Sequence, residues 1–259
     1  MNVLNYILKT LENRKMHMTL LDPAKQTPEK SAEIAELIEK LGTDAIMIGG
    51  STNITQSIMD KTILKIKSVT KTPIIIFPNG VQSISKYADA IYFMSLLNSS
   101  DRAFLIENQM MAAPLIKKLG LEPIPMGYII IEPGMAVGRV GKAILLKKDE
   151  ISKAVGYALA AEFLGMKLVY FEAGSGSPEP VNENLISAVK NEVNIPIIVG
   201  GGITDIEKAR KILNAGASII VTGTLVERFP DYDERLKGII GVVRGAKIEN
   251  KDGDFKRKI

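Results

Sequence analysis

Residues 196–203 read Pro-Ile-Ile-Val-Gly-Gly-Gly-Ile, an apolar run that ends in a glycine triplet. The same order recurs on both sides of it: Lys167–Phe171 precedes Glu172-Ala173-Gly174-Ser175-Gly176, and Ser218–Thr222 precedes Gly223-Thr224. Short continuous apolar runs are typical of parallel strands that are covered on both faces. Glycine lets a ligand approach the backbone closely, so these three strand ends are candidates for one binding site.

Five further apolar runs precede these three in the chain. Eight such runs, separated by segments long enough for helices, predict an α/β fold of the closed (β/α)8, or TIM, barrel type. The length of 259 residues is ordinary for one such barrel, and no linker interrupts it, so we expect one domain spanning residues 1–259. The five other predicted strands are Met18–Leu21, Ala45–Ile48, Pro73–Phe77, Ala90–Met94 and Pro125–Ile131.

The segments between the strands have the signals of amphipathic helices, with one exception. Pro28–Leu41 follows a capping residue, Thr27, and ends before Gly42, and Thr204–Glu207 has the spacing of a capping box. Only Asn79–Asp89 separates the third and fourth strands, which predicts a third helix that is truncated or replaced and an apolar opening beside the fourth strand. The other predicted helices are Asp101–Leu119, Lys148–Leu164, Val181–Val193 and Asp231–Val243.

The composition excludes several kinds of chemistry. The chain has no cysteine and one histidine, His17, so thiol catalysis and the usual zinc sites are excluded. We expect His17 to precede the first strand and to have a structural role. A metal ion would need oxygen ligands, which favours Mg²⁺.

Charge and hydropathy indicate a cytoplasmic protein. The formal net charge is +4, and residues 244–259 hold six basic and three acidic residues. We interpret this segment as a frayed, solvated tail rather than a surface for nucleic acid or membrane, because the aromatic residues of a nucleic-acid binder are missing. Residues 1–10 lack the pattern of a secretion signal, and no apolar stretch reaches the ~20 residues of a membrane span. Membrane contact is therefore expected to be peripheral at most.

Residues after the predicted strands carry the candidate chemistry, because barrels of this class place their sites at the carboxyl ends of the strands. The glycine clusters predict a phosphate site, since exposed backbone N–H groups there can bind an anion. Asp22 and Ser51 follow the first two strands and could share a Mg²⁺ ion, although both are also common capping residues. Glu172 lies between a strand and a glycine cluster, which suggests either a general base or an ion-pair partner.

Several of these segments together resemble one family, the geranylgeranylglyceryl phosphate synthases. The similarity runs from the first strand to the last, and Tyr170–Gly176 is its most specific part. One departure is visible: where the family has Asp-Pro-Asp-Lys, this chain has Asp22-Pro23-Ala24-Lys25 and lacks the second acid. The segments that carry the resemblance are His17–Pro23, Ile48–Ser51, Phe93–Asn98, Tyr170–Gly176 and Val199–Ile203.

The resemblance implies transfer of a geranylgeranyl group from its diphosphate to the C3 hydroxyl of sn-glycerol 1-phosphate, the first ether bond of archaeal membrane lipids. It implies Mg²⁺ on Asp22 and Ser51, an active-site role for Tyr128, and a dimer or hexamer of the chain. A bacterial relative of the family uses a longer, heptaprenyl donor. The residues implied to bind glycerol phosphate are Tyr170, Phe171, Glu172, Ala173, Gly174, Ser175, Gly176, Gly201, Gly202, Gly223 and Thr224.

Two other functions share the phosphate site. A phosphoribosyl isomerase, or an enzyme of the indole-glycerol-phosphate type, would need an acid–base pair across the barrel, with a partner for Asp22 such as Glu132. A barrel that binds phosphate without catalysis is also consistent with the pattern, because a fold does not fix a function.

Overall fold

A computed structural model describes residues 2–50 and 54–246 of the chain. Its strands are β1 (Met16–Leu21), β2 (Ala45–Ile48), β3 (Ile74–Ile76), β4 (Ala90–Leu96), β5 (Glu122–Ile130), β6 (Leu168–Glu172), β7 (Ile197–Gly200) and β8 (Ile219–Thr222). All pair in parallel and in chain order, and β8 returns to β1 to close the barrel. The predicted (β/α)8 fold is therefore confirmed.

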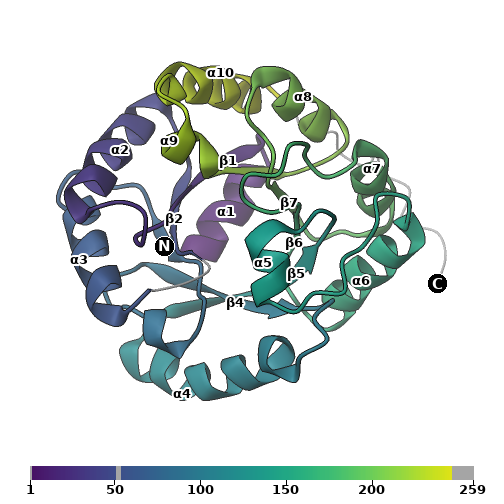
Figure 1. Cartoon of the computed structure of the whole chain (residues 1–259), viewed down its shortest axis with the longest axis horizontal. Coiled ribbons are helices and arrows are strands. Elements are labelled where there is room, and N and C mark those ends of the chain that lie inside the picture. Colours follow the sequence, from purple (N-terminus) through teal and green to yellow (C-terminus); the bar gives the residue numbers. More distant parts are fainter. Residues whose placement is uncertain (1, 51–53, 247–259) are drawn as a thin grey trace.

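The helices lie mostly in an outer ring around the barrel, and α1 and α5 lie inside that ring (Figure 1). The helices are α1 (Val3–Leu11), α2 (Pro28–Leu41), α3 (Gln56–Lys67), α4 (Asn108–Leu119), α5 (Met135–Val140), α6 (Ile151–Phe163), α7 (Glu183–Glu192), α8 (Ile206–Asn214), α9 (Thr224–Arg228) and α10 (Tyr232–Gly245), with a 3-10 turn η1 (Val81–Ser83) and a π-helical turn η2 (Ala103–Glu107). Within the described residues, no helix is long and apolar enough to cross a membrane.

The strands divide their side chains between two apolar cores. Alternate residues point inward and form the barrel interior, which includes Met18, Ile75 and Ile198. The intervening residues point outward and pack against the helices, as Ile46 and Val199 do. This alternation along each strand decides which residues can reach a site at the barrel mouth.

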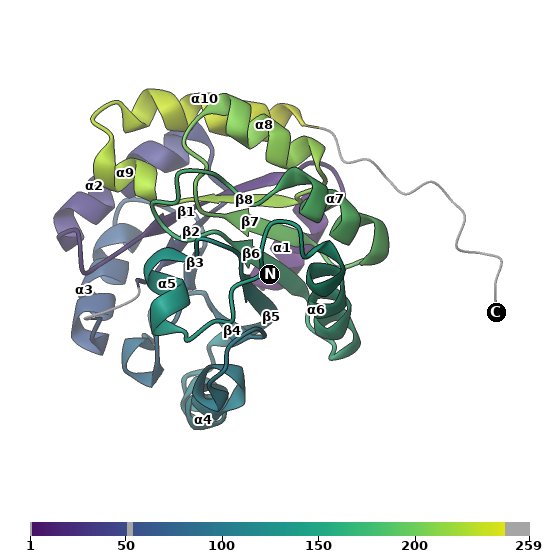
Figure 2. The ribbon, with the colours of Figure 1, turned by 45° about the vertical axis from the view of Figure 1, so that its right-hand side comes forward.

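The α1 helix closes the amino-terminal end of the barrel. Val3, Ile7 and Leu11 lie one turn apart and pack into the barrel interior. The Glu122 carboxylate, at the start of β5, accepts hydrogen bonds from the backbone N–H groups of Val3 and Leu4 at 2.6 and 3.0 Å. Figure 2 shows α1 away from α5 and α9, which lie at the carboxyl ends of the strands. The site must therefore open at the end where α5 and α9 lie.

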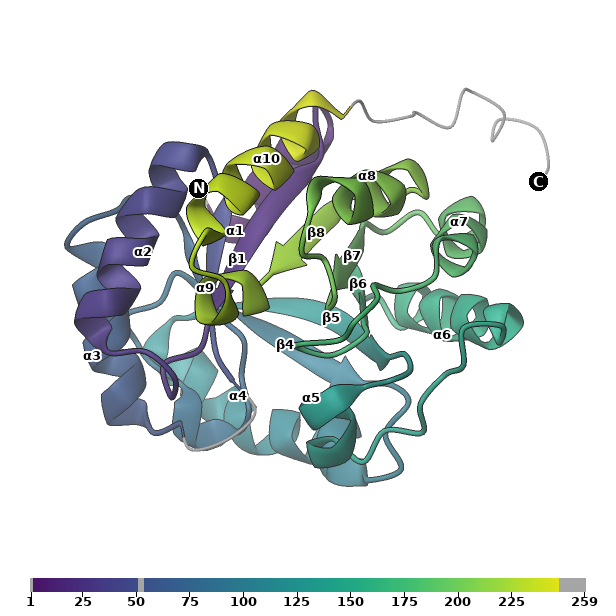
Figure 3. The same cartoon turned by 45° about the horizontal axis from the view of Figure 1, so that its top comes forward.

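The connection between β3 and β4 departs from the regular barrel as expected. It contains only the short η1 turn, so no full helix covers this part of the wall. The following helix, α4, stands apart from the barrel in Figure 2, and in the view of Figure 3 it lies behind α5. Apolar side chains of β4, including Ile91 and Phe93, therefore face an opening between β4, η1 and α4.

Three expectations need correction or restriction. His17 lies within β1, not before it, because β1 already pairs with β8 at Met16. The N-cap of α8 is Asp205, whose side chain accepts from Lys208 N–H, so Thr204 does not form the predicted capping box. Arg244 belongs to α10 rather than to a tail, and residues 247–259 of the predicted tail lie outside the described residues.

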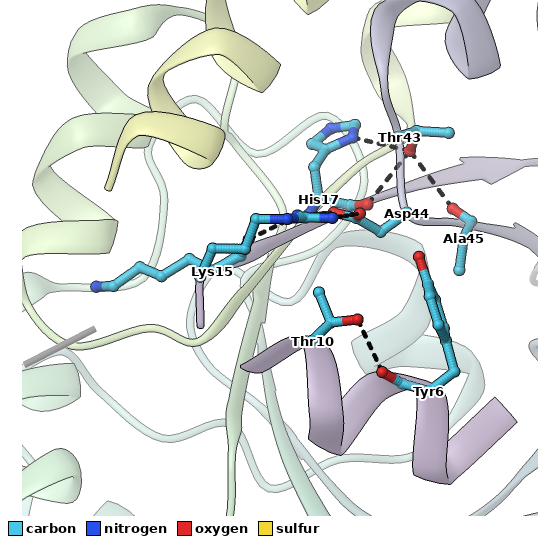
Figure 4. A network of polar contacts seen from close by, with 8 residues as sticks. Tyr6, Thr10, Lys15, His17, Thr43, Asp44 and Ala45 are labelled. Carbon is cyan, nitrogen blue, oxygen red and sulfur yellow. Dashed lines mark hydrogen bonds and ion pairs between the residues drawn. The ribbon is translucent and has the colours of Figure 1, made fainter. Parts of the chain in front are cut away.

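His17 does have the expected structural surroundings. Its ring nitrogens lie 3.0 Å from the hydroxyls of Thr43 and Thr222, and its backbone N–H donates to Asp44. Figure 4 shows Thr43 and Asp44 meeting His17, and Asp44 also accepts a hydrogen bond from Arg14 at 2.5 Å. Complete burial lowers the pKa of His17 to about 4, so the ring is neutral near pH 7.

Candidate active site

The glycine-rich ends of β6, β7 and β8 form a small polar pocket. Thr224 links the loop after β8 to the loop after β6. Its hydroxyl accepts a hydrogen bond from Gly176 N–H at 2.9 Å and lies 3.0 Å from the Ser175 hydroxyl. Gly201 and Gly202 have φ angles of +82° and +71°, where other residues are strained. The residues that line this pocket include Tyr170, Glu172, Ser175, Gly176, Gly201, Gly202, Gly223 and Thr224.

Glu172 sits at the inner end of this pocket. Its carboxylate accepts a hydrogen bond of 2.6 Å from the Gly174 N–H group. A Cβ atom placed on Gly201 would lie 2.4 Å from the Glu172 Oε1 atom, so only glycine leaves room for the carboxylate. Burial raises the pKa of Glu172 to about 7, although the Tyr170 hydroxyl and the Gly174 N–H oppose the shift. A carboxyl group with this pKa can act as a general base near neutral pH.

Two tyrosines place hydroxyl groups beside Glu172. Tyr128 and Tyr170 are adjacent strand partners, and their rings meet edge to face with centroids 5.2 Å apart. Burial raises the pKa of both, and the Glu172 carboxylate raises each further. Both phenols therefore stay protonated and can donate hydrogen bonds at the barrel mouth.

A larger, mainly apolar pocket opens beside β4, where η1 takes the place of a full helix between β3 and β4. It extends from the barrel mouth to α4, and residues of η1 and α5 complete its wall. Glu172, Ser175 and Leu20 line both this pocket and the glycine pocket, so the two join at the Glu172 carboxylate. The remaining lining includes Phe77, Ile84, Ile91, Phe93, Met94, Phe104, Ala112, Ile116, Tyr128 and Val137.

Asp22 directly follows β1 and lines neither pocket itself, but it lies against Gly50, which lines the apolar pocket. Its carboxylate is nearly buried against Gly50, where a Cβ atom would lie 2.3 Å from the Asp22 Oδ1 atom. Ala24 N–H donates to the Oδ1 atom, while the Oδ2 atom faces Lys25 Nζ at 3.5 Å. Ser51, the other predicted metal ligand, lies outside the described residues.

The described residues do not form an all-protein metal cage. Among them, no three acidic or histidine side chains converge on a common position. One carboxylate beside an open backbone does fit Mg²⁺, which usually keeps several waters and takes further oxygen ligands from substrate phosphates.

Not every predicted site residue points at the pockets. The side chains of Phe171 and Ala173 are fully buried in the outer core, so these two residues can contact a ligand only through their backbones. Glu132, the partner suggested for Asp22 in the isomerase alternative, is exposed in a turn and lines neither pocket. The predicted ligand-binding roles of Phe171 and Ala173 came from the Tyr170–Gly176 motif as a whole, not from the direction of each side chain.

The sequence interpretation missed two charged residues of the site. Glu227 on α9 lines the glycine pocket, and its Oε2 atom lies 2.8 Å from Lys25 Nζ. These residues are 202 positions apart in the chain, so only the closure of the barrel brings them together. The Asp22-Pro23-Ala24-Lys25 segment contained a signal, because it places a lysine three residues after a candidate metal ligand.

Comparisons with known proteins identify relatives over nearly the whole chain. A geranylgeranylglyceryl phosphate synthase of Picrophilus torridus is 54% identical over 243 residues, which are 94% of this chain and all of that protein. The solved structure of the synthase from Thermoplasma volcanium has 49% identity and a TM-score of 0.93, and covers 96% of this chain and 100% of its own.

A second solved structure carries a ligand. It is (S)-3-O-geranylgeranylglyceryl phosphate synthase from Thermoplasma acidophilum in complex with its substrate sn-glycerol-1-phosphate. Its identity is 48% and its TM-score 0.92, with 95% of this chain and 99% of that chain covered. Residues 9–243 match the PcrB family. The resemblance noted in the sequence is confirmed, and the chain belongs to the PcrB family.

Proposed function

We propose that this chain transfers a geranylgeranyl group from geranylgeranyl diphosphate to the C3 hydroxyl of sn-glycerol 1-phosphate. The observation that carries the proposal is that an apolar pocket and a glycine-lined polar pocket meet at one buried carboxylate, Glu172. One pocket suits a long hydrocarbon chain and the other a phosphate group, so their junction is where the two substrates would react. Relatives at about half identity carry the same activity in their names.

The glycine pocket suits the phosphate of glycerol phosphate. Open backbone at Gly202 and Gly223 and the hydroxyls of Ser175 and Thr224 can surround an anion. A ligand with its phosphate there extends its carbon end toward Glu172. The Thermoplasma acidophilum relative, which was solved with sn-glycerol-1-phosphate, supports glycerol phosphate as the substrate.

The reaction then needs little from the protein beyond position and charge. The glycerol C3 oxygen forms a bond to the allylic carbon as the carbon–oxygen bond to the diphosphate breaks, and Glu172 accepts the hydroxyl proton. Holding the weak hydroxyl nucleophile close to that carbon lowers the activation free energy by several kcal/mol, as in other well-oriented reactions. Tyr128 can hold the hydroxyl or the departing oxygen by donating a hydrogen bond. A Mg²⁺ ion on Asp22, with Ser51, would supply positive charge for the leaving diphosphate.

Product analysis tests this function directly. The protein is incubated with geranylgeranyl diphosphate, sn-glycerol 1-phosphate and Mg²⁺, and the ether product and free diphosphate are quantified by mass spectrometry. We expect both products to require both substrates and the metal, and sn-glycerol 3-phosphate to react poorly. Diphosphate release that is independent of glycerol phosphate would contradict the proposal.

Two further arms of that experiment test the finer claims. A series of prenyl diphosphates of increasing length identifies the preferred donor. Asp22→Asn keeps the size of the side chain but removes its charge, so Mg²⁺-dependent turnover should be abolished while the melting temperature is kept. The dimer or hexamer, the cytoplasmic location and the absence of nucleic-acid binding stay predictions.

A further inference from the structure

Neither pocket has a positive side chain in its wall. Among the described residues that line the apolar and glycine pockets, there is no lysine or arginine. The proposed substrates nevertheless bring a phosphate and a diphosphate to adjacent positions. Backbone N–H groups can serve the phosphate in the glycine pocket, whereas the described wall of the apolar pocket offers the diphosphate no side-chain cation to act together with the Mg²⁺ ion proposed on Asp22.

Lys25 is a cation that pairs with Asp22 and, across the barrel closure, with Glu227 of the glycine pocket, although it lines neither pocket itself. Its Nζ atom lies between two acids, 2.8 Å from Glu227 Oε2 and 3.5 Å from Asp22 Oδ2. The side chains of Asp22 and Glu227 are 11% and 12% exposed, while that of Lys25 is 50% exposed. Lys25 is therefore the most exposed side chain of this cluster.

The cluster of Asp22, Lys25 and Glu227 combines one ammonium group with two carboxylates. Two carboxylates share one ammonium group, so the cluster keeps a net negative charge. Glu227 lines the glycine pocket, where an unneutralised carboxylate would repel a phosphate. Lys25 thus shields this pocket while it remains available to a second anion.

The position of the apolar pocket identifies that anion. Gly50 and Leu20 line this pocket, and the Asp22 carboxylate lies against Gly50. A donor whose chain fills the apolar pocket must hold its polar end beside Gly50, next to Asp22 and Lys25. On the glycine side, a different cation approaches: a Cβ atom on Gly176 would lie 2.8 Å from the Arg228 guanidinium.

We infer that Lys25 binds the diphosphate of the prenyl donor and that Glu227 holds the ammonium group in place until the donor arrives. This inference rests on the proposed function for the identity of the donor. The bond that breaks leaves its electron pair on a diphosphate oxygen, and the Lys25 ammonium stabilises that charge through a hydrogen bond. Lys25 keeps its proton throughout.

The alternative role for Lys25 is a tether between β1 and α9, and a pair of variants separates the two roles. Glu227→Gln breaks the bridge but leaves the lysine, and the double variant Lys25→Met, Glu227→Gln breaks the bridge and removes the cation. Both variants carry a neutral glutamine at position 227, so no carboxylate is left there without its lysine partner. Any difference between these two proteins therefore reports the lysine itself.

The measurement is isothermal titration of inorganic pyrophosphate, with and without Mg²⁺, and of sn-glycerol 1-phosphate in parallel. We expect Glu227→Gln to bind pyrophosphate at least as tightly as the unaltered chain, because the competing carboxylate is gone. The double variant should bind it about tenfold to a hundredfold more weakly, the range for losing a hydrogen bond to a charged group. Its affinity for sn-glycerol 1-phosphate should stay within about threefold of that of Glu227→Gln, below that range.

Two results would overturn the inference. Pyrophosphate affinities of the two variants that agree within about threefold, well under the expected range, would show that Lys25 does not contact the anion. A similar loss in both variants would show that only the tether matters. Lys30→Met, which removes an exposed lysine paired with Glu33, is the control and should change neither affinity. Lys25-dependent pyrophosphate binding without any prenyl transfer would refute the proposed function, and with it the prenyl donor, while showing that Lys25 binds a diphosphate group.

Discussion

At the scale of single residues, Glu172 carries the sharpest kinetic prediction. Glu172→Gln keeps the size of the side chain but replaces a base by an amide that cannot accept the proton. We expect kcat to fall by about 10²–10⁴, the usual range for a positioned acid–base group. Because the pKa of Glu172 is raised to about 7, the unaltered protein should gain kcat/KM as the pH rises through that value. Steady-state rates between pH 5 and 9 check both effects, at values chosen to bracket that pKa.

Two controls accompany the Glu172 variant. Phosphate binding should change little, because the variant keeps the backbone and the Ser175 and Thr224 hydroxyls proposed to bind it, and Glu183→Gln on the surface of α7 should leave the rate and the pH profile unaltered. A kcat that survives within about a factor of three, far below the acid–base range, would make Glu172 a structural residue.

Gly202 is the residue that tests the phosphate pocket. A Cβ atom there would lie 2.4 Å from the Glu179 carbonyl oxygen, and the φ angle of +71° disfavours any side chain. Gly202→Val should therefore displace the loop and raise the KM for glycerol phosphate more than the KM for the prenyl donor. Equal increases in the two KM values would indicate general damage to the barrel. Gly241→Ala on α10 has free space around the new methyl group and is the matched control.

The sequence predicted the chemical types of the site better than the direction of each side chain. Glu172, Gly202 and Thr224 lie where the strand ends indicated. Phe171 belongs to the same motif as Glu172, yet strand alternation turns it into the outer core. Glu227 could not be found from local pattern, because its partner Lys25 is distant in the chain and meets it only when the barrel closes.

At the scale of elements, the apolar pocket exists because the connection between β3 and β4 contains only the short η1 turn instead of a full helix. Ala112 on α4 lines this pocket, whereas its neighbour Ala113 is exposed. Ala112→Phe should fill the far part of the pocket, raise the KM for geranylgeranyl diphosphate about tenfold or more, and favour shorter donors, since each lost methylene contact is worth about 0.8 kcal/mol. Product mass after competition between geranyl and geranylgeranyl diphosphate measures the shift.

Ala113→Phe adds the same ring to the other face of α4 and controls for any loss of helix stability. The two variants should melt at similar temperatures and differ only in donor preference. An unchanged preference in Ala112→Phe would mean that the prenyl chain takes another path.

Local chemistry in the sequence located some elements and missed others, such as α3, which Thr55 caps. Pro28–Leu41 begins after Thr27 and ends at a left-handed Gly42, as predicted. The short Asn79–Asp89 connection indicated the opening beside β4 because chain length alone excludes a full helix there. The helix α1 was missed, although Val3, Ile7 and Leu11 have helical spacing, because its role as a plug depends on the barrel it closes.

At the scale of the whole molecule, two buried groups bias the stability in opposite directions with pH. His17 has a folded pKa of about 4, below its ordinary value of 6.5, so stability is lost as the pH falls through this window. Glu172 has a folded pKa of about 7, above its ordinary value of 4.5, so stability is lost as the pH rises through that window. Each group contributes a change of about 3 kcal/mol.

The two windows overlap between pH 4.5 and 6.5, where the opposing slopes should cancel and leave an almost flat stability curve. Glu172→Gln removes one slope. In this variant the free energy of unfolding should rise by about 3 kcal/mol as the pH increases through the window of His17, and the variant should exceed the unaltered chain above pH 7. Urea unfolding from pH 4 to 8, a range that spans both windows, measures both curves. Parallel curves for the two proteins would show that Glu172 is not buried as a neutral acid at low pH, and would remove the physical basis for its assignment as the general base.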